Sequence, residues 1–262
     1  MTHAKQSMPS EPSPALLQHR AIRVNVYARI GSLTYSICMK TVAIISQKGG
    51  VGKTTIATAL AVAAERAGKI AAVFDLDPQA SATFWKDTRT ADTPAVVAIP
   101  PARLQHVLKA AADTGCDLAI IDAPPFAKDI AFEAAQHADF ILIPTRPAVL
   151  DVMAMTKTLE LVAHYKRPSA VVLTFCPIQG REIADTEEAV KQLGAAIAPV
   201  RIHNRVAYSR AQQTGLTAQE FEPDGKAAEE IKQLYAYMCM HVFTTTAEAP
   251  HVRPAKLAAS RS

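Results

Sequence analysis

Residues 41–55 read Thr-Val-Ala-Ile-Ile-Ser-Gln-Lys-Gly-Gly-Val-Gly-Lys-Thr-Thr, and this stretch decides the fold. The apolar run at its start predicts a buried strand, and the glycines that follow predict a tight loop. Glycine lets backbone N–H groups turn inward and surround phosphate oxygens. A helix that starts where such a loop ends adds its positive dipole end to the same site. The stretch therefore predicts a phosphate-binding loop between a strand and a helix.

Eight consecutive residues are candidates for binding the nucleotide: Lys48, Gly49, Gly50, Val51, Gly52, Lys53, Thr54 and Thr55. In a loop of this kind the lysine before the threonine reaches the β- and γ-phosphates, and the threonine hydroxyl binds Mg²⁺. We therefore expect Lys53 to bind phosphate and Thr54 to bind the metal. The expected cofactors are ATP and Mg²⁺. ATP is preferred to GTP because the chain contains no Asn-Lys-x-Asp sequence of the kind that reads guanine.

The loop departs from its ordinary form at one end. The usual spacing has a glycine at the position of Gln47, and here a second lysine, Lys48, comes next. With its Gly-Gly pair and double threonine, the loop resembles the deviant Walker A motif of the ParA/MinD ATPases. The resemblance, to the small ParA class, implies a homodimer that closes on ATP. It also implies that Lys48 is catalytic and contacts the nucleotide of the partner subunit.

The rest of the chain alternates between predicted strands and helices. Strands are expected at residues 41–46, 70–75, 117–122, 140–144, 170–175 and 198–202, and helices at 54–67, 103–114 and between the later strands. Such repeated units predict an α/β fold with a mostly parallel, doubly wound sheet and helices on both faces. This is the arrangement of a P-loop NTPase, in which ligands bind at the carboxyl ends of the strands.

Two carboxylates follow predicted strands at that edge. Phosphoryl transfer to water needs a metal and an oriented water molecule. Asp122 follows the apolar residues 118–121, where an acid typically holds Mg²⁺; the alternative is an aspartate that caps a turn. Asp77 lies in Asp75-Leu-Asp-Pro-Gln, which resembles the ParA switch I sequence and implies that Asp77 is catalytic and positions the attacking water. Asp75 would then contact the metal through solvent or serve the structure.

Two C-terminal segments bear on base and DNA recognition. Many family members have an asparagine that reads adenine at the position of Thr174. Because this chain has threonine there, the residues that contact the base stay open. A backbone contact from residues 199–204 is one substitute.

Residues 199–231 resemble the closing region of short partition ATPases. The resemblance implies that Arg201, Arg205 and Arg210 form a patch that binds non-specific DNA, with strong salt dependence. The alternative is a solvated face with ordinary ion pairs.

Composition suits one domain. The chain has 262 residues, of which 49% are hydrophobic, and a formal net charge of +4, so it has enough length for a substantial core and a mildly basic surface. We expect a P-loop ATPase domain at residues 39–243, a disordered N-terminal extension at 1–38 and a disordered basic tail at 244–262. The extension is open to three interpretations: a basic arm, a transit peptide, or translation from an upstream start codon.

The resemblance implies an ATPase for plasmid or chromosome partition. Its partner would be a centromere-binding protein of the ParB type, which stimulates hydrolysis and releases the dimer from DNA. The expected location is cytoplasmic and nucleoid-associated, with no membrane partner, since no apolar run reaches the ~20 residues that cross a bilayer. Two alternatives stay open: a ParA-like positioner of other cargo, such as a protein cluster or conjugation complex, and a metabolic ligase of the dethiobiotin or cobyrinic acid synthase type.

Overall fold

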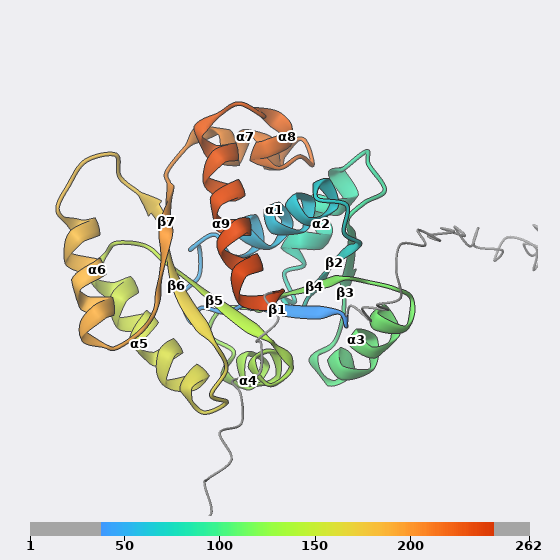
Figure 1. The fold of residues 1–262 in the computed structure, drawn as a ribbon, viewed down its shortest axis with the longest axis horizontal. Coiled ribbons are helices and arrows are strands. Elements are labelled where there is room, and N and C mark those ends of the chain that lie inside the picture. Colours follow the sequence, from blue (N-terminus) through green and yellow to red (C-terminus); the bar gives the residue numbers. More distant parts are fainter. Residues whose placement is uncertain (1–37, 244–262) are drawn as a thin grey trace, which may run out of the picture. The chain divides into compact units, whose positions relative to one another are not determined.

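The structure is a computed structural model that describes residues 38–243. The extension expected up to residue 38 and the tail expected from residue 244 lie outside this range, apart from Cys38 itself. In the described residues, seven strands form one sheet in the order β3-β2-β4-β1-β5-β6-β7 (Figure 1), and every pair is parallel. The strands are β1 Lys40–Ile44, β2 Ala71–Asp75, β3 Ala95–Ala98, β4 Leu118–Asp122, β5 Phe140–Thr145, β6 Ser169–Cys176 and β7 Ile197–His203.

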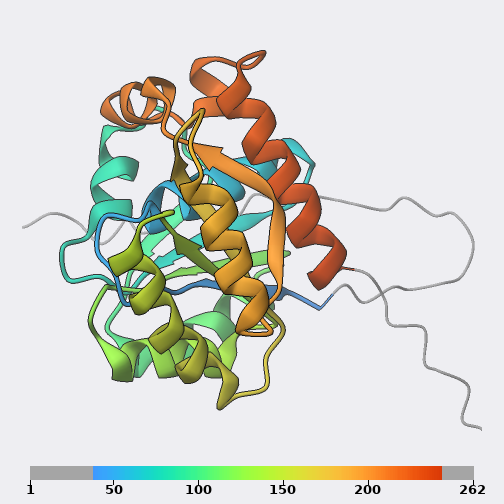
Figure 2. The same cartoon turned by 90° about the vertical axis from the view of Figure 1, so that its left-hand side faces the viewer.

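Helices cover both faces of this sheet, as Figures 1 and 2 show. They are α1 Lys53–Arg66, α2 Ser81–Thr88, α3 Leu104–Asp113, α4 Lys128–His137, α5 Val149–Ala163, α6 Glu182–Gln192, α7 Val206–Gln213, α8 Ala218–Phe221 and α9 Lys226–Val242, with a 3₁₀ turn at Pro101–Arg103. None of the helices in residues 38–243 combines the length and apolar character that crossing a bilayer requires. The predicted doubly wound α/β fold is confirmed.

Side chains of the sheet enter two hydrophobic cores in alternation. On β1, Val42 and Ile44 pack into one core and Ala43 into the other, because successive side chains of a strand point to opposite faces. Residues of α1 and α9 complete the first core, and residues of α3, α4, α5 and α6 complete the second. The central strands are therefore buried on both sides, which explains why they read as continuous apolar runs.

The predicted strands are present with ends shifted by one or two residues, but several elements are not predicted from the sequence, β3 and α2 among them. β3 is an edge strand with no buried side chain, and its four apolar residues, Ala-Val-Val-Ala, are too short a run to distinguish a strand from a helix. α2 is a short helix whose first N–H groups bond to Asp75, a residue of the preceding strand. Its start therefore depends on a carboxylate from outside the usual capping positions.

The winding of the sheet reverses at β1. Strands β2 to β4 lie on one side of β1, and β5 to β7 lie on the other. Such a reversal opens a crevice at the carboxyl ends of the strands. At this edge Ile44 of β1 pairs with Asp122 of β4, and Asp122 pairs with Asp75 of β2. The loop that follows β1 therefore lies beside both carboxylates.

Candidate nucleotide-binding site

The loop between β1 and α1 takes the conformation that its glycines allow. Gly50 and Gly52 have φ angles of +69° and +85°, a left-handed backbone that other residues rarely adopt. Gly52 immediately precedes α1, and no side chain caps the first turn of that helix. The N–H groups of this turn are therefore available to an anion, as a nucleotide phosphate requires.

Lys53 lies buried at the start of α1. Its Nζ donates a hydrogen bond to the backbone carbonyl of Lys48 at 3.0 Å. Burial lowers the pKa of Lys53, and the charges of Asp122 and Asp77 partly oppose this shift. A triphosphate would supply a much closer counter-charge to this ammonium. The position of Lys53 fits the phosphate-binding role that the sequence predicts.

Thr54 and Asp122 meet at the carboxyl end of β4. The Thr54 hydroxyl donates to Oδ2 of Asp122 at 2.6 Å, and the buried Oδ1 has no hydrogen-bond partner among the described residues. Burial raises the pKa of Asp122 to about 7. The hydrogen bond from Thr54 lowers this pKa, and the negative charge of Asp75 raises it further. A cation would relieve this cost, and Mg²⁺ takes such oxygen ligands. The two predicted metal ligands therefore lie together.

No group of three or more His, Cys, Asp or Glu side chains able to hold a metal occurs in the described part of the chain. Mg²⁺ does not need one, since it is usually held by one or two protein groups together with nucleotide phosphates and water. The residues around Thr54 and Asp122 therefore fit Mg²⁺ that enters with a nucleotide better than a metal bound by protein alone.

Asp75 and Asp77 have different surroundings. The buried carboxylate of Asp75 accepts hydrogen bonds from the N–H groups of Asp77, Ala82 and Thr83 at 3.0 to 3.2 Å. These bonds tie the loop after β2 to the first turn of α2, which fits the structural one of the two roles expected for Asp75. Asp77 is half-buried, and within residues 38–243 its carboxylate accepts one hydrogen bond, from the N–H of Gln79. Its carboxylate lines the cleft that also contains Lys53 and Thr54, which fits an expected role in orienting water.

The cleft has two connected parts. A part of about 660 Å³ is bounded by the phosphate loop, Asp77 and α7. A second part of about 300 Å³ adjoins it and has mostly apolar walls, including Ile56 and Ile202. Phe175 borders both parts. The buried Thr174 hydroxyl lines the apolar part and has no hydrogen-bond partner in residues 38–243. The shape suits a nucleotide with phosphates at the loop and the base in the apolar part.

One contact in this cleft has no sequence signal. Gln212 of α7 donates a hydrogen bond from Nε2 to the hydroxyl of Thr55 at 2.8 Å. The two residues are 157 positions apart, and an isolated glutamine in a short helix carries no motif. Only the tertiary structure shows that α7 touches the phosphate loop.

Lys48 lies at the outer end of the loop. It forms no ion pair with any residue of 38–243. Its side chain borders a hollow between α4 and α5 that Phe126, Leu150 and Met153 also line. These three apolar side chains are 73%, 68% and 59% exposed. Lys48 thus stands beside an uncovered apolar surface and apart from the interior of the cleft.

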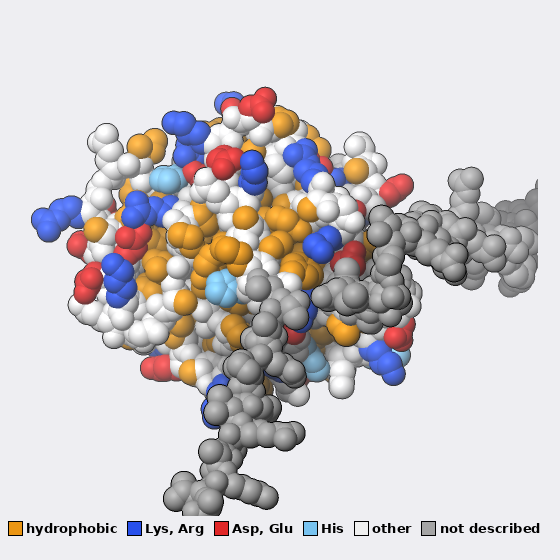
Figure 3. All heavy atoms as spheres, in the orientation of Figure 1, with side chains coloured by type: hydrophobic (Ala, Val, Ile, Leu, Met, Phe, Trp, Pro, Cys, Tyr) orange, Lys and Arg blue, Asp and Glu red, His pale blue; other side chains and the backbone are white. Residues whose placement is uncertain are grey.

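The three predicted DNA-binding arginines differ in their partners. Arg201 forms an ion pair with Glu187 of α6, and Arg205 forms one with Glu230 of α9. Arg210 is exposed and has no ion pair among the described residues. Arg205 and Arg210 line one surface hollow together. On the face that Figure 3 shows, Lys and Arg side chains are interspersed with acidic ones over α7, α8 and the start of α9.

Comparisons with known proteins agree with this geometry. Residues 42–218 match the family model described as the CobQ/CobB/MinD/ParA nucleotide binding domain. The chain is 30% identical over 207 residues to maintenance of carboxysome distribution protein A of Halothiobacillus neapolitanus, covering 74% of this chain and 94% of that protein. It is 27% identical over 223 residues to protein ParA of Rhizobium radiobacter, covering 80% and 99%.

A solved structure also shares the fold. The septum site-determining protein MinD of Pyrococcus horikoshii, complexed with Mg-ADP, superposes with a TM-score of 0.66 at 18% identity, over 76% of this chain and 96% of that one.

Proposed function

The chain belongs to the CobQ/CobB/MinD/ParA family of nucleotide-binding proteins, and on this basis we propose that it is a ParA-type ATPase that positions cargo over DNA. It is an ATP-hydrolysing enzyme that uses ATP and Mg²⁺. In the proposed cycle, ATP closes a homodimer and the dimer binds non-specific DNA at the nucleoid. A partner protein then stimulates hydrolysis and releases the dimer.

The observation that carries this proposal is the contact between Thr54 and Asp122 at 2.6 Å, beside the buried ammonium of Lys53. Bound Mg²⁺ would neutralise charge that develops on the phosphates during hydrolysis. Thr54 and Asp122 would hold that ion, and Lys53 would bind the β- and γ-phosphates. Asp77, with one carboxylate oxygen free of the Gln79 hydrogen bond, would orient the attacking water.

The surface around Lys48 supports the proposed homodimer. Phe126, Leu150 and Met153 are exposed beside it, and a cluster of exposed apolar side chains commonly marks an interaction surface. A second copy that covers this surface would bring its own nucleotide close to Lys48. Lys48 would then contribute positive charge to the transition state of the partner subunit, in the manner of a group supplied in trans.

The proposed DNA surface includes fewer of the three arginines than the sequence suggests. Arg201 and Arg205 are already paired with carboxylates, so each would have to exchange a partner before it bound phosphate. Arg210 is exposed without an ion pair in the described residues, and Lys226 lines the same hollow. We place the main phosphate contact at Arg210, with Arg205 as a secondary one.

Two cargoes fit this cycle. A plasmid or chromosome origin would be carried through a centromere-binding protein of the ParB type. A protein assembly would be carried through a different adaptor, and the 30% identity to a carboxysome-distribution protein favours this second candidate. The two share the ATP cycle and differ in the partner that stimulates hydrolysis. A co-purification from the native organism, followed by an ATPase assay with each recovered partner, would separate them.

The central test is binding to non-specific duplex DNA with ATP, with ADP and without nucleotide, over a series of salt concentrations. We expect binding with ATP and none with ADP or without nucleotide. The logarithm of the affinity should fall steeply and linearly with the logarithm of the salt concentration, because phosphate contacts release counterions. Lys53→Ala is the matched control, since without the phosphate-binding ammonium it should show no ATP-dependent binding. DNA binding that is equal in all three nucleotide states would contradict the proposed switch.

A further inference from the structure

The segment formed by α7 and α8, residues 206–221, depends on its neighbours for its position. Only Ala211 is buried in α7, and only Ala218 and Gln219 are buried in the four residues of α8. Such short helices are not stable by themselves and take their stability from tertiary contacts. We call residues 206–221 the α7–α8 segment. Polar contacts attach this segment to α1 and to α2 and the residue that follows it.

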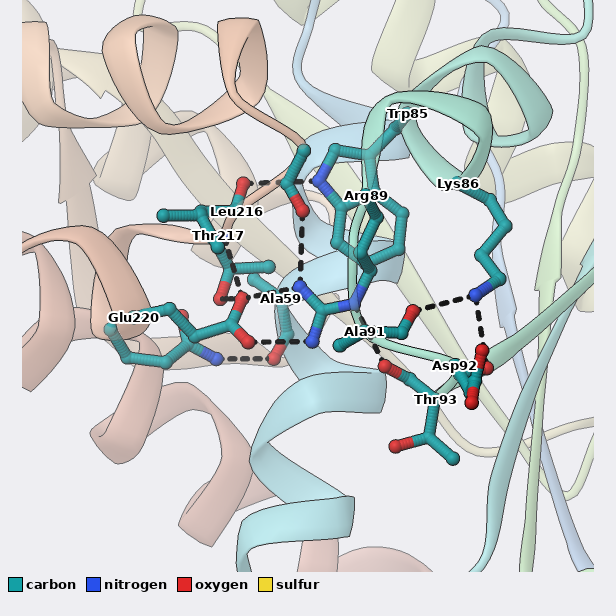
Figure 4. A network of polar contacts seen from close by, with 12 residues as sticks. Ala59, Trp85, Lys86, Arg89, Ala91, Asp92, Thr93, Leu216, Thr217 and Glu220 are labelled. Carbon is teal, nitrogen blue, oxygen red and sulfur yellow. Dashed lines mark hydrogen bonds and ion pairs between the residues drawn. The ribbon is translucent and has the colours of Figure 1, made fainter.

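The strongest contact joins the end of α2 to α8. Arg89 follows α2 directly, and its Nη2 and Nη1 donate to Oε1 and Oε2 of Glu220 at 2.6 and 2.9 Å (Figure 4). The two side chains are 5% and 16% exposed. Burial alone would raise the pKa of Glu220, but hydrogen bonds from Arg89 and Thr217 outweigh it and lower that pKa. A two-point pair of this kind constrains orientation as well as distance.

Two further contacts hold the turn between α7 and α8 against α2. Nη1 of Arg89 donates to the carbonyl of Gly215, and Nε1 of Trp85 donates to the carbonyl of Leu216, each at 3.0 Å (Figure 4). Gly215 has a φ of +67°, and a Cβ at this position would lie 2.5 Å from the Cα of Arg89. The two backbones are therefore in direct contact, and the two hydrogen bonds hold the turn against the end of α2.

The same segment also contacts α1. Besides the hydrogen bond from Gln212 to Thr55, Gln219 of α8 donates from Nε2 to the carbonyl of Ala59 at 2.6 Å. The α7–α8 segment therefore contacts both the helix that begins at the phosphate loop and the helix that follows Asp77. Both neighbours are parts of the nucleotide site.

α2 connects the two ends of this arrangement. Its first turn is bonded to Asp75 beside the Asp77 loop, and Arg89 follows its last residue. Eight helical residues span about 12 Å. Residues 76–80 lead directly into α2, so a rearrangement of this loop that releases the bonds to Asp75 would displace the helix and, with it, the group that holds Glu220.

We propose that the Arg89–Glu220 ion pair transmits the nucleotide state from the Asp77 loop to the α7–α8 segment, and so controls the position of Arg210. This inference rests on the proposed function, because it takes the Asp77 loop as the part that responds to the γ-phosphate. An equilibrium between two positions of α2 is shifted by ATP if the loop contacts differ between them. Because the ion pair joins the end of α2 to α8, the α7–α8 segment would change position whenever α2 does.

Amide hydrogen exchange on the full chain tests this relay. The exchange of residues 81–88 and 216–221 is compared with Mg²⁺ and either ADP or a non-hydrolysable ATP analogue. In the wild type we expect the exchange rates of both regions to differ roughly tenfold between the two nucleotide states, which is within the usual range of coupling between sites. In Arg89→Met combined with Glu220→Met, which leaves no unpaired buried charge, only residues 81–88 should respond, with unchanged affinity for the analogue.

Lys86→Met is the matched control. Lys86 lies on the same helix, but its Nζ bonds to the carbonyls of Ala91 and Asp92 (Figure 4), so the relay should persist. If the double variant unfolds, Arg89→Lys replaces it, because lysine keeps the charge but cannot form the two-point pair. That variant should lose most of the response in residues 216–221.

Two results would overturn the relay. One is a response in residues 216–221 that persists in the double variant, or in Arg89→Lys where the double variant unfolds. The other is a wild type in which residues 81–88 respond and residues 216–221 do not. If the wild type binds no nucleotide and neither residues 48–55 nor 81–88 respond, the proposed ATPase function fails as well. The two failures are therefore distinguishable.

Discussion

The hydroxyl of Thr54 and the carboxylate of Asp122 are 2.6 Å apart, so the first turn of α1 and the end of β4 are joined at one point. The two residues are 68 positions apart in the chain. Parallel pairing of β1 with β4 brings them together, because the loop that leads into α1 leaves the sheet beside the end of β4. The candidate metal site is therefore assembled by the pairing of these two strands.

Thr54→Ala should lower the rate of ATP hydrolysis by about 100-fold, because it removes one metal ligand and with it part of the charge stabilisation that Mg²⁺ supplies. Steady-state turnover measured over a range of Mg²⁺ concentrations would show the effect. Thr54→Ser keeps the hydroxyl and serves as the control. Equal turnover in the alanine and serine variants would remove Thr54 from the metal site.

Lys48→Ala should abolish most hydrolysis while the monomer still binds ATP, because the ammonium acts on the partner's nucleotide. Nucleotide affinity and turnover are measured side by side. Lys157→Ala is a suitable control, since Lys157 is an exposed cation that lines the same hollow. Turnover at the wild-type level in Lys48→Ala would exclude a role across the dimer.

Leu150→Asp should weaken ATP-dependent dimerisation by at least roughly tenfold, since burying a leucine contributes about 2 kcal/mol and the aspartate would add a charge at the interface. Sedimentation with a non-hydrolysable ATP analogue measures the effect. Ile178→Asp introduces aspartate at another exposed apolar residue, which is 81% exposed and does not line the Lys48 hollow. The proposed dimer surface is wrong if both variants dimerise like the wild type.

Arg210→Glu should weaken ATP-dependent DNA binding and lower the salt slope by about 1, because the variant can no longer bind the phosphate that Arg210 neutralises. Its ATP affinity should not change. Lys109→Glu introduces the same charge change at an exposed residue of α3, on the other face of the sheet, and controls for net charge. Fluorescence anisotropy with labelled duplex DNA gives affinity and slope together; identical decreases in both variants would indicate a general charge effect.

Glu220→Gln should destabilise the folded protein by about 3 kcal/mol at neutral pH, because Arg89 would be left buried without a counter-charge. The pKa of Glu220 is lower in the folded state than its ordinary value. The contribution of its charge is therefore complete above the unfolded pKa, and it is lost as pH falls through the folded pKa. Denaturant unfolding at neutral and acidic pH should show the difference between variant and wild type shrink with acidification.

Much of the site follows from local sequence. The left-handed angles of Gly50 and Gly52, the apolar strands before the loop and before Asp122, and the lysine and threonine that begin α1 all express rules that act over a few residues. Backbone sterics and strand periodicity operate at that range. The loop, the fold class and the candidate metal ligands Thr54 and Asp122 could therefore be predicted from motif and spacing, whereas the contact between these two residues depends on the pairing of β1 with β4.

Contacts between distant segments decided the rest. The carboxylate of Asp75 bonds to the first turn of α2, and Glu187 and Glu230 form ion pairs with two of the three predicted DNA-binding arginines. The chain order shows neither arrangement, because ion pairing depends on which side chains the packing of helices on the sheet brings within a few ångströms. For the same reason only the tertiary structure places Arg89 on Glu220, 131 residues away, and so links α2 to the segment that carries Arg210.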